Sequence, residues 1–459
     1  MKQILSSALL IGLLFVTSNL YAQEKRTITI QEAIDLALEN NYQLKQAKNN
    51  LDLAEYTLKS EYADFLPSLS ASFSGSRRTG QQFISDRFSE GLDPFVNITS
   101  QSISGNFSAS IPIFNGFENI HTLRASEQSK ISEEESYNRA KEQVIFSTAE
   151  AYLRVLLDME LLEIAKENLA NSNQQLEQVQ AQVEVGSRPT VDLYDQEALV
   201  ASDELSLTQQ ENALKLSKTL LVRQLQIDPL GEYVFTIPEI NPVANSERVQ
   251  AYSLSELIDQ ALLNRSDLKS TRANIRVLEL QYKMSKASLY PSVNASAGLS
   301  TSYSDQYSVA GTDVNFGDQF FDQRINRSMG FSVSIPLFQN WNRMTNIQSS
   351  QVQLKNAELN LDNSRLQVIQ EVTQAYNDYT SYIKQLQASE KSMRASERAF
   401  ETQQERYNVG SSSLIELSQA QSNYVSAQSN YTQATYNLIF QEKLLDYFLG
   451  KLSGDSVQF

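Results

Sequence analysis

The chain has 459 residues, a formal net charge of −16 at pH 7, one histidine and no cysteine. The acidic balance argues against nucleic acid as a partner, because phosphate binding needs basic patches. Without cysteine the protein cannot form disulfides or carry a lipid on an N-terminal cysteine. Any membrane attachment must therefore come from the folded chain itself.

Residues 1–22 predict a secretory signal peptide. Lys2 precedes an apolar run over 4–16, and the small residue Ala22 ends the segment. The run is shorter than the ~18 apolar residues that a helix needs to span a bilayer, which makes a membrane anchor the weaker alternative. The mature protein is expected to begin near Gln23.

A tandem repeat organises the rest of the chain. The segment AIDLALENNYQLK at 33–45 recurs as LIDQALLNRSDLK at 257–269, a shift of 224 residues (257 − 33). Other short segments follow the same shift without a gap: SIPIF at 110–114 becomes SIPLF at 334–338, and VGS at 185–187 becomes VGS at 409–411. Such self-similarity predicts two copies of one structural unit.

The repeat sets the expected domain boundaries. The first repeat is expected over 23–226 and the second over 251–450. Residues 227–250 join the two, and 451–459 form a C-terminal tail.

In the first repeat, a helix over about 31–66 precedes two expected strands. At about 68–76, SLSASFSGS places Leu69 and Phe73 on one face and only serine on the other, the period of two that is typical of a strand. Residues of about 102–114 repeat the pattern. Each segment has roughly the ~9–11 residues that a tilted strand needs to cross a membrane.

Proline stands at the four expected junctions between strands and helices, where a residue that cannot donate a ladder hydrogen bond is tolerated. The four are Pro67, Pro112, Pro291 and Pro336. Both ends of each strand pair continue into helices. All helices should therefore lie on one side of the membrane, with polar loops near 77–101 and 301–327 on the other.

A long helix is expected over 118–185 and a return helix over 191–228, both with apolar residues spaced by seven as in a coiled coil. At about 1.5 Å per residue the long helix would reach roughly 100 Å, which is longer than a compact domain core. The helices at 31–66 and 191–228 could together lie alongside it.

The segment VGSRPTVDLYD at 185–195 interrupts this helical pattern. Gly186 can adopt the left-handed conformation that ends a helix, and Pro189 can begin the next one. VGSSSLIELSQ at 409–419 occupies the equivalent place in the second repeat. Both segments are expected to be turns at the far ends of the long helices.

The second repeat predicts the same succession: strands at about 292–300 and 329–338, a long helix over 343–409 and a return helix over 414–449. Four strands cannot close on themselves, because the smallest single-chain barrels have about 8, and an open edge is not tolerated in lipid. Three copies would supply twelve strands, with serine faces inside and apolar faces toward lipid. A soluble β-sandwich is the alternative.

Taken together, these features resemble the TolC-type outer membrane efflux proteins. The resemblance rests on the duplication, on the order helix, proline, strand, loop, strand, proline, helix, and on three segments. They are AYLRVLLDMELLEIAKENL at 151–169, VGSRPTVDLYD at 185–195 and RYNVGSSSLIELSQAQ at 406–421.

The resemblance implies an α+β membrane protein: a homotrimer with a twelve-stranded β-barrel in the outer membrane of a Gram-negative bacterium, continued by an α-helical barrel in the periplasm. It would be the exit duct of a tripartite efflux pump or a type I secretion system. Its partners would be a periplasmic adaptor protein, an inner-membrane transporter of the RND or ABC type and outer membrane lipid. Residues 227–249 and the tail would form a belt around the helical barrel.

No enzyme motif competes with this interpretation. The single histidine, His121, has no cysteine partners, and no phosphate loop or nucleophile motif is present, so we expect no cofactor and no metal. Two other classes of protein stay open. A passive porin would have no need of long helices, and a structural coiled-coil spacer would not need four lipid-compatible strands.

The two turns are the candidate functional site. In the family, the adaptor tip seats on these turns, so the resemblance gives contact roles to Val185, Gly186, Ser187, Val409, Gly410 and Ser411.

A ring of acids is the second part of the candidate site. Asp192 and its equivalent Glu416 (192 + 224) would place six carboxylates at one level of a trimeric pore, where Arg188 could hold them closed by charge-assisted hydrogen bonds. Asp195 lies one turn further on. The alternative is a solvated helix end, because acids are favoured in any first turn.

The pattern departs from the family at this point. The family's arginine with two acids is best matched in the second half of its members, whereas this chain carries it in the first. Ser412 and Gln419 occupy the positions equivalent to Arg188 and Asp195. Which helix pair moves on opening is therefore left open.

Overall fold

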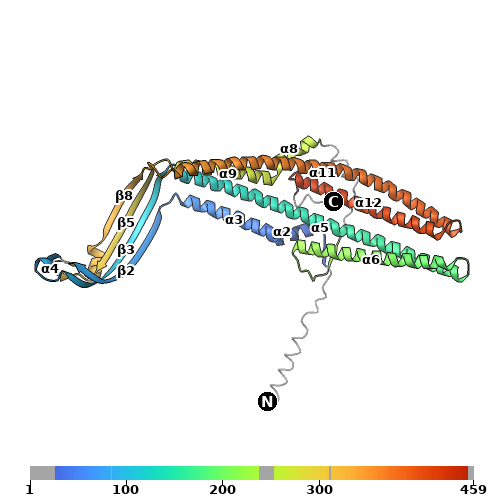
Figure 1. Cartoon of the computed structure of the whole chain (residues 1–459), viewed down its shortest axis with the longest axis horizontal. Coiled ribbons are helices and arrows are strands. Elements are labelled where there is room, and N and C mark those ends of the chain that lie inside the picture. Colours follow the sequence, from blue (N-terminus) through green and yellow to red (C-terminus); the bar gives the residue numbers. More distant parts are fainter. Residues whose placement is uncertain (1–25, 84, 237–252, 310–311, 453–459) are drawn as a thin grey trace, which may run out of the picture. The chain divides into compact units, whose positions relative to one another are not determined.

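The computed structural model describes residues 26–83, 85–236, 253–309 and 312–452 (Figure 1). The expected signal peptide lies outside these residues, as do most of 227–250 and of the tail. The chain divides into two units, which are described separately. One comprises 1–49, 135–269 and 363–459, and the other comprises 50–134 and 270–362.

A four-stranded antiparallel sheet dominates the second unit, in the order β2-β3-β5-β8 (Figure 1). Its strands are β2 (Ser68–Phe83), β3 (Phe95–Asn115), β5 (Ser292–Ser304) and β8 (Asn326–Ser334). Shorter elements lie between them: α4 (Ser85–Ser89), the β6 (Ser308–Val309) and β7 (Thr312–Asp313) hairpin, α10 (Phe316–Asp318) and the π-helix η1 (Gln319–Gln323). Within the described part of the chain, β2 and β8 each pair on one side only.

The first strand pair is longer than the sequence pattern predicts. The ladder of β2 and β3 continues to Phe83 opposite Phe95, so much of the polar segment 77–101 is strand and not loop. Thr79 and Thr99 face each other there, with their hydroxyls 3.1 Å apart. Loss of apolar alternation does not end a ladder, because the backbone supplies the hydrogen bonds.

In the second pair, β5 runs to Ser304 and β8 occupies 326–334 instead of 329–338. Pro336 accounts for the earlier end of β8, because it cannot donate to the ladder. Pro67 and Pro291 immediately precede β2 and β5. Pro112 is not at a junction: it lies inside β3, where the register with β5 shifts between Pro112 and Phe114, a bulge that accommodates the missing N–H.

The two faces of the sheet differ sharply in polarity. Serine hydroxyls pair across β2 and β3 at 2.7–2.8 Å: Ser68 with Ser110, Ser70 with Ser108, Ser74 with Ser104 and Ser76 with Ser102. The opposite face carries large apolar side chains, and Phe73, Met329 and Phe331 are 77%, 92% and 80% exposed in the single chain. Period-two alternation thus gives one hydroxyl face and one uncovered apolar face.

The eight longer helices of the described residues form two sets of four. The first set is α2 (Ile30–Asn40), α3 (Tyr42–Ala63), α5 (Glu118–Glu184) and α6 (Thr190–Leu225), and the second is α8 (Leu254–Asn264), α9 (Ser266–Ala287), α11 (Asn342–Asn408) and α12 (Leu414–Phe448). Each helix of the second set begins 224 residues after its counterpart. None of the helices in the described residues combines the length and apolarity that a membrane span requires.

The single helix expected over 31–66 is in fact two. Asn41 leaves the helical region with φ −57° and ψ 120°, and its side-chain oxygen accepts a hydrogen bond of 3.0 Å from the backbone N–H of Leu44. Asparagine is a favoured N-cap because it satisfies such a free N–H. The spacing of apolar residues does not reveal this break, because the apolar positions continue on both sides of it.

The first unit has its main core around Tyr152 of α5. The strands β1 (Arg26–Ile28) and β4 (Tyr233–Phe235) pair in parallel beside it. The buried Tyr152 hydroxyl lies 3.0 Å from the carbonyl oxygen of Ile28 and 2.9 Å from that of Thr236. Leu156, Leu221 and Leu225 complete the centre of this core.

In the second repeat the position equivalent to Asn41 is occupied by Arg265, a buried arginine at the centre of an ion network. The Arg265 side chain is 5% exposed and donates hydrogen bonds of 2.6 Å to Asp267 and to Glu371 of α11. Burial by itself would raise the pKa of Asp267, but the bonds from Arg265 outweigh it and lower that pKa. The two repeats thus use different chemistry at the same break.

Candidate functional site at the two hairpin turns

The turns at Gly186 and Gly410 share one backbone geometry. Gly186 has φ +75° and Gly410 has φ +77°. The N–H of Gly186 donates to the carbonyl of Val183, and that of Ser187 donates to the carbonyl of Gln182, both at 2.9 Å. This is the Schellman pattern that ends a helix.

The second turn repeats it. The Gly410 N–H donates to the Tyr407 carbonyl at 3.0 Å, and the Ser411 N–H donates to the Arg406 carbonyl at 2.8 Å. The side chains of Val185 and Val409 are each 79% exposed. Each turn therefore presents an uncovered valine beside a glycine backbone.

The helices that follow the two turns begin differently. Ser413 caps α12 in a full capping box with Glu416, whereas its equivalent Pro189 precedes α6 without a side-chain cap. The Glu416 carboxylate accepts hydrogen bonds from the Ser412 hydroxyl at 2.7 Å and from the backbone N–H of Ser413 at 3.1 Å. These bonds, that of Ser412 above all, lower the pKa of Glu416.

Arg188 makes the contact that connects the first turn with α11. Its Nη1 lies 3.4 Å from Oδ2 of Asp192, and its Cζ lies 4.2 Å from the ring centroid of Tyr407. Both charged side chains are less than one fifth exposed. Burial raises the pKa of the Tyr407 hydroxyl, while Arg188 opposes the change.

The expected acidic cluster is only partly assembled within one chain. Arg188 pairs with Asp192, as expected. Glu416 is held inside its own hairpin by Ser412 and Ser413, and Asp195 is exposed. Among the described residues, Arg188 therefore bonds to one of the three candidate acids. The capping box explains the difference, because it satisfies Glu416 locally.

Tyr407 was not among the candidate residues, because its spacing marks it only as a packing residue. It belongs to a small core with Val179, Leu414 and Leu417, against which Leu193 also packs. This core joins α5, α6, α11 and α12 within the chain. The contact of Tyr407 with Arg188 joins the two repeats. The only sequence signal for this contact is that the two turns are equivalent and could lie side by side.

A buried polar cluster around Ser172 was also missed. The Gln421 amide donates hydrogen bonds of 2.9 Å to Asn168 and 3.1 Å to the Ser172 hydroxyl. The Gln196 amide donates to the Ser172 carbonyl at 3.0 Å, and the Ser172 hydroxyl donates to Asp203. This cluster joins α5, α6 and α12. Isolated polar residues in a heptad sequence are its only signal.

The described residues contain no group of three or more histidine or acidic side chains arranged to hold a metal ion. What the turns offer is two exposed backbone corners and one charged contact between hairpins. Such an arrangement can dock a partner or hold two hairpins together.

Comparison with known proteins identifies the family. The model of the family described as "Outer membrane efflux protein" matches residues 33–225 and 257–451. This chain belongs to the outer membrane efflux protein family. The efflux family accounts for the order of helices and strands in both halves of the chain.

Individual relatives agree. The outer membrane efflux protein BepC of Brucella suis is 21% identical over 357 residues, which cover 78% of this chain and 70% of BepC. The cation efflux system protein CusC of Escherichia coli O157:H7 is 23% identical over 337 residues, 72% of this chain and 65% of CusC. The chain thus spans about two thirds of the length of these relatives.

Solved structures show the same fold. A crystal structure of CusC has a TM-score of 0.77 at 18% identity and covers 92% of each chain. The Campylobacter jejuni CmeC outer membrane channel has a TM-score of 0.76 at 18% identity and covers 92% of this chain and 85% of CmeC. The expected TolC-type family is confirmed, and with it the class of function, an outer membrane exit duct for efflux.

Proposed function

We propose that three copies of this efflux protein form one duct, a twelve-stranded barrel continued by a barrel of helices. The observation that carries the proposal is the four-stranded sheet. It combines two edges, β2 and β8, with a serine face and an uncovered apolar face. An uncovered edge in lipid is not tolerated, so each edge needs a strand from another copy.

The helical unit of each copy would lie in the periplasm, with the protein anchored by its barrel and not by a lipid, since the chain has no cysteine. The corresponding lengths of the two helix sets, together with the two family matches, support a tandem duplication. The duct would work in a tripartite pump or a type I system, with a periplasmic adaptor and an inner-membrane transporter of the RND or ABC type.

The adaptor would contact the two turns at Val185, Gly186, Ser187, Val409, Gly410 and Ser411. Exposed valines, and glycines with open space around them, support this role in both turns. A variant with Val185→Asp and Val409→Asp should conduct normally as purified protein but fail to complement export in cells. Normal export by this variant would remove the turns as the docking site.

The closed state of the duct would be held by Arg188. Its guanidinium bonds to Asp192 of the same hairpin and lies over the ring of Tyr407 on the other hairpin. Separating the two hairpins therefore breaks the contact between Arg188 and Tyr407. Asp192, Asp195 and Glu416 from three chains would make the mouth favourable to cations. Glu416 would contribute charge to this ring without bonding to Arg188.

Conductance in planar bilayers tests both the duct and its gate. Arg188→Met and Tyr407→Leu should each raise the open probability of the wild-type channel by about 2- to 30-fold, the range of a cation–π contact. The double variant should open no more than either single one, because both remove the same contact. Asp192→Asn should weaken block by a multivalent cation.

Arg398→Met is the matched control, because Arg398 is an exposed arginine of α11 away from the turns. The absence of conductance in every variant would favour a structural spacer. A channel that is fully open in the wild type and unchanged in all variants would favour a passive porin.

A further inference from the structure

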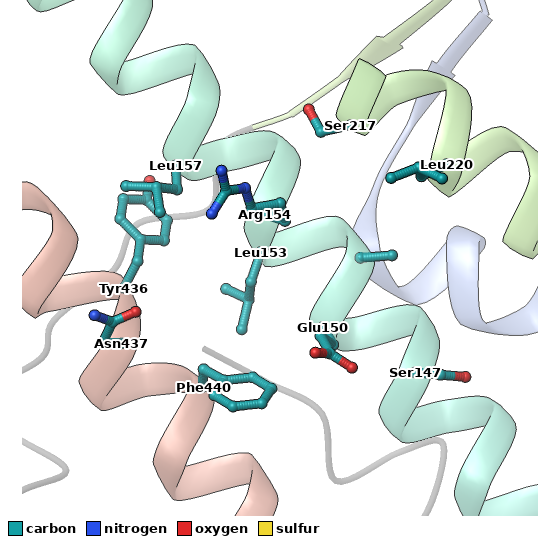
Figure 2. Close-up of a pocket in the computed structure, with 11 residues that line it drawn as sticks. Ser147, Glu150, Leu153, Arg154, Leu157, Ser217, Leu220, Tyr436, Asn437 and Phe440 are labelled. Atoms are coloured by element: carbon teal, nitrogen blue, oxygen red, sulfur yellow. The ribbon is translucent and has the colours of Figure 1, made fainter. Parts of the chain in front are cut away.

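A groove in the first unit has no role in the duct described above. It is lined by three helices (Figure 2), and its volume of about 390 Å³ is within the range of volumes found for small-molecule sites. Leu153 and Leu157 of α5 form its buried floor, at 3% and 7% exposure. Tyr436 and Phe440 of α12 form one wall, and Leu220 of α6 contributes to the other.

One carboxylate in this groove has no partner. Glu150 makes no hydrogen bond or ion pair with any residue that the structure describes, and Figure 2 shows it beside Leu153 and Phe440. Glu150 is open to solvent on one side, and its partial burial against the apolar lining raises its pKa by disfavouring the charged form. A bound cation would supply the compensating charge.

The charge of the groove is otherwise balanced. Arg154, the only basic residue lining it, has its Nε 3.3 Å from the buried Asp158 carboxylate. That pair leaves the Glu150 charge as the net charge of the site. Phe440 lies near Glu150 and Tyr436 lies further along the same wall (Figure 2), and an aromatic face attracts a cation by about 0.5–2 kcal/mol in other proteins.

The groove opens away from the β1–β4 sheet. Tyr152 points toward that sheet, where it bonds to Ile28 and Thr236. Glu150 and Arg154 are each two residues from Tyr152, which is about 200° around an α-helix. In the proposed duct the β1–β4 pair would lie on the outside of the helical barrel, which places the groove on the side of the channel interior.

We infer that this groove is a binding site for an amphipathic organic cation, whose charged nitrogen pairs with Glu150 and whose rings lie against Tyr436 and Phe440. The inference rests on the proposed function, because it places the site on the path of exported molecules. It names a class of exported molecule that the duct itself would bind on the way out. The residues at the equivalent places in the other repeat are Gln374, Asn212 and Leu216, so the site occurs once per chain.

Equilibrium binding of rhodamine 6G, an aromatic cation, to the purified full protein tests the site. Fluorescence anisotropy should show saturable binding that Glu150→Gln and Phe440→Ala each weaken by about two- to thirtyfold. Glu177→Gln, an exposed acid of the same helix outside the groove, should leave the affinity unchanged. Fluorescein, an anionic dye of similar ring structure, should not compete.

Equal affinity of wild type, Glu150→Gln and Glu177→Gln for rhodamine 6G would overturn the inference. The Glu150→Gln variant should fold normally, because the replaced group is open to solvent and the new side chain has the same size. Its affinity therefore tests the site even where Phe440→Ala fails to fold. Bilayer conductance separates this test from that of the duct. A protein that conducts but ignores Glu150 keeps its proposed function and loses this site, whereas one that binds without conducting does the reverse.

Discussion

Gly410 shows how much a single backbone conformation decides at the hairpin turns. Its φ of +77° is one that side chains with a branched Cβ resist, and no atom lies within 4 Å of where a Cβ would stand. A substitution there therefore tests backbone strain without a steric clash. The same holds for Gly186.

We predict that Gly410→Val raises the hydrogen exchange rates of the Gly410-turn amides about tenfold, since a left-handed residue costs roughly 1–2 kcal/mol. Gly410→Asn should raise them much less, because asparagine tolerates this conformation. Exchange measured by mass spectrometry on peptides covering 406–413 reports the effect. Equal exchange in the two variants would mean that the turn does not depend on its left-handed residue.

Arg265 carries the second residue-scale prediction. Arg265→Met removes the ion pairs that Asp267 and Glu371 make with a buried guanidinium, and because both carboxylates stay partly open to solvent, it should lower the free energy of unfolding by about 2 kcal/mol. Arg276→Met is the control, because the Arg276 pair with Glu279 is exposed and should contribute at most about 1 kcal/mol.

The pH dependence of this effect has a definite sign. The folded pKa of Asp267 is lowered, so its contribution is complete above its unfolded pKa of about 4 and is lost as the pH falls further. The difference in melting temperature between wild type and Arg265→Met should therefore be largest near neutral pH and narrow below about pH 4. A constant difference down to pH 3 would contradict this assignment.

At the scale of elements, the strands carry their orientation in their alternation. Phe73→Lys places a charge on the uncovered apolar face, where it should cost about 2–4 kcal/mol in lipid and deplete the protein from the outer membrane fraction. Ser74→Lys, one residue further, falls on the hydroxyl face and should be tolerated. Fractionation and immunoblotting measure both. The opposite ranking would reverse the assigned faces.

Sequence periodicity predicted the elements and the bounds of the long helices well, but the bounds of the strands poorly. The shift of 224 residues, the existence of the four long strands and the long helices follow from local patterns, and the long helices begin within one residue of expectation. The break at Asn41 and the extension of β2 to Phe83 depend on one cap and on backbone pairing, to which hydrophobic spacing is insensitive. The Arg188–Tyr407 contact joins residues from different repeats, and no local pattern encodes that distance.

At the scale of the whole molecule, the native absence of cysteine allows a direct test of assembly. A double variant with Ser72→Cys on β2 and one of Ser328→Cys, Gly330→Cys or Ser332→Cys on β8 should form disulfides between neighbouring copies. Non-reducing gels should then show species up to three chains and no larger. A ladder beyond three would indicate an open polymer, and single-cysteine variants should show no trimer.

The unequal starts of α6 and α12 bear on which hairpin yields when the duct opens. A missing N-cap leaves the first N–H groups of α6 without a side-chain acceptor, a deficit of about 1 kcal/mol that α12 does not have. Once the Arg188 contact is released, the first turn of α6 should fray before that of α12. The hinge of this channel would then lie in its first repeat, and the capped second hairpin would stay in place while the first one moves.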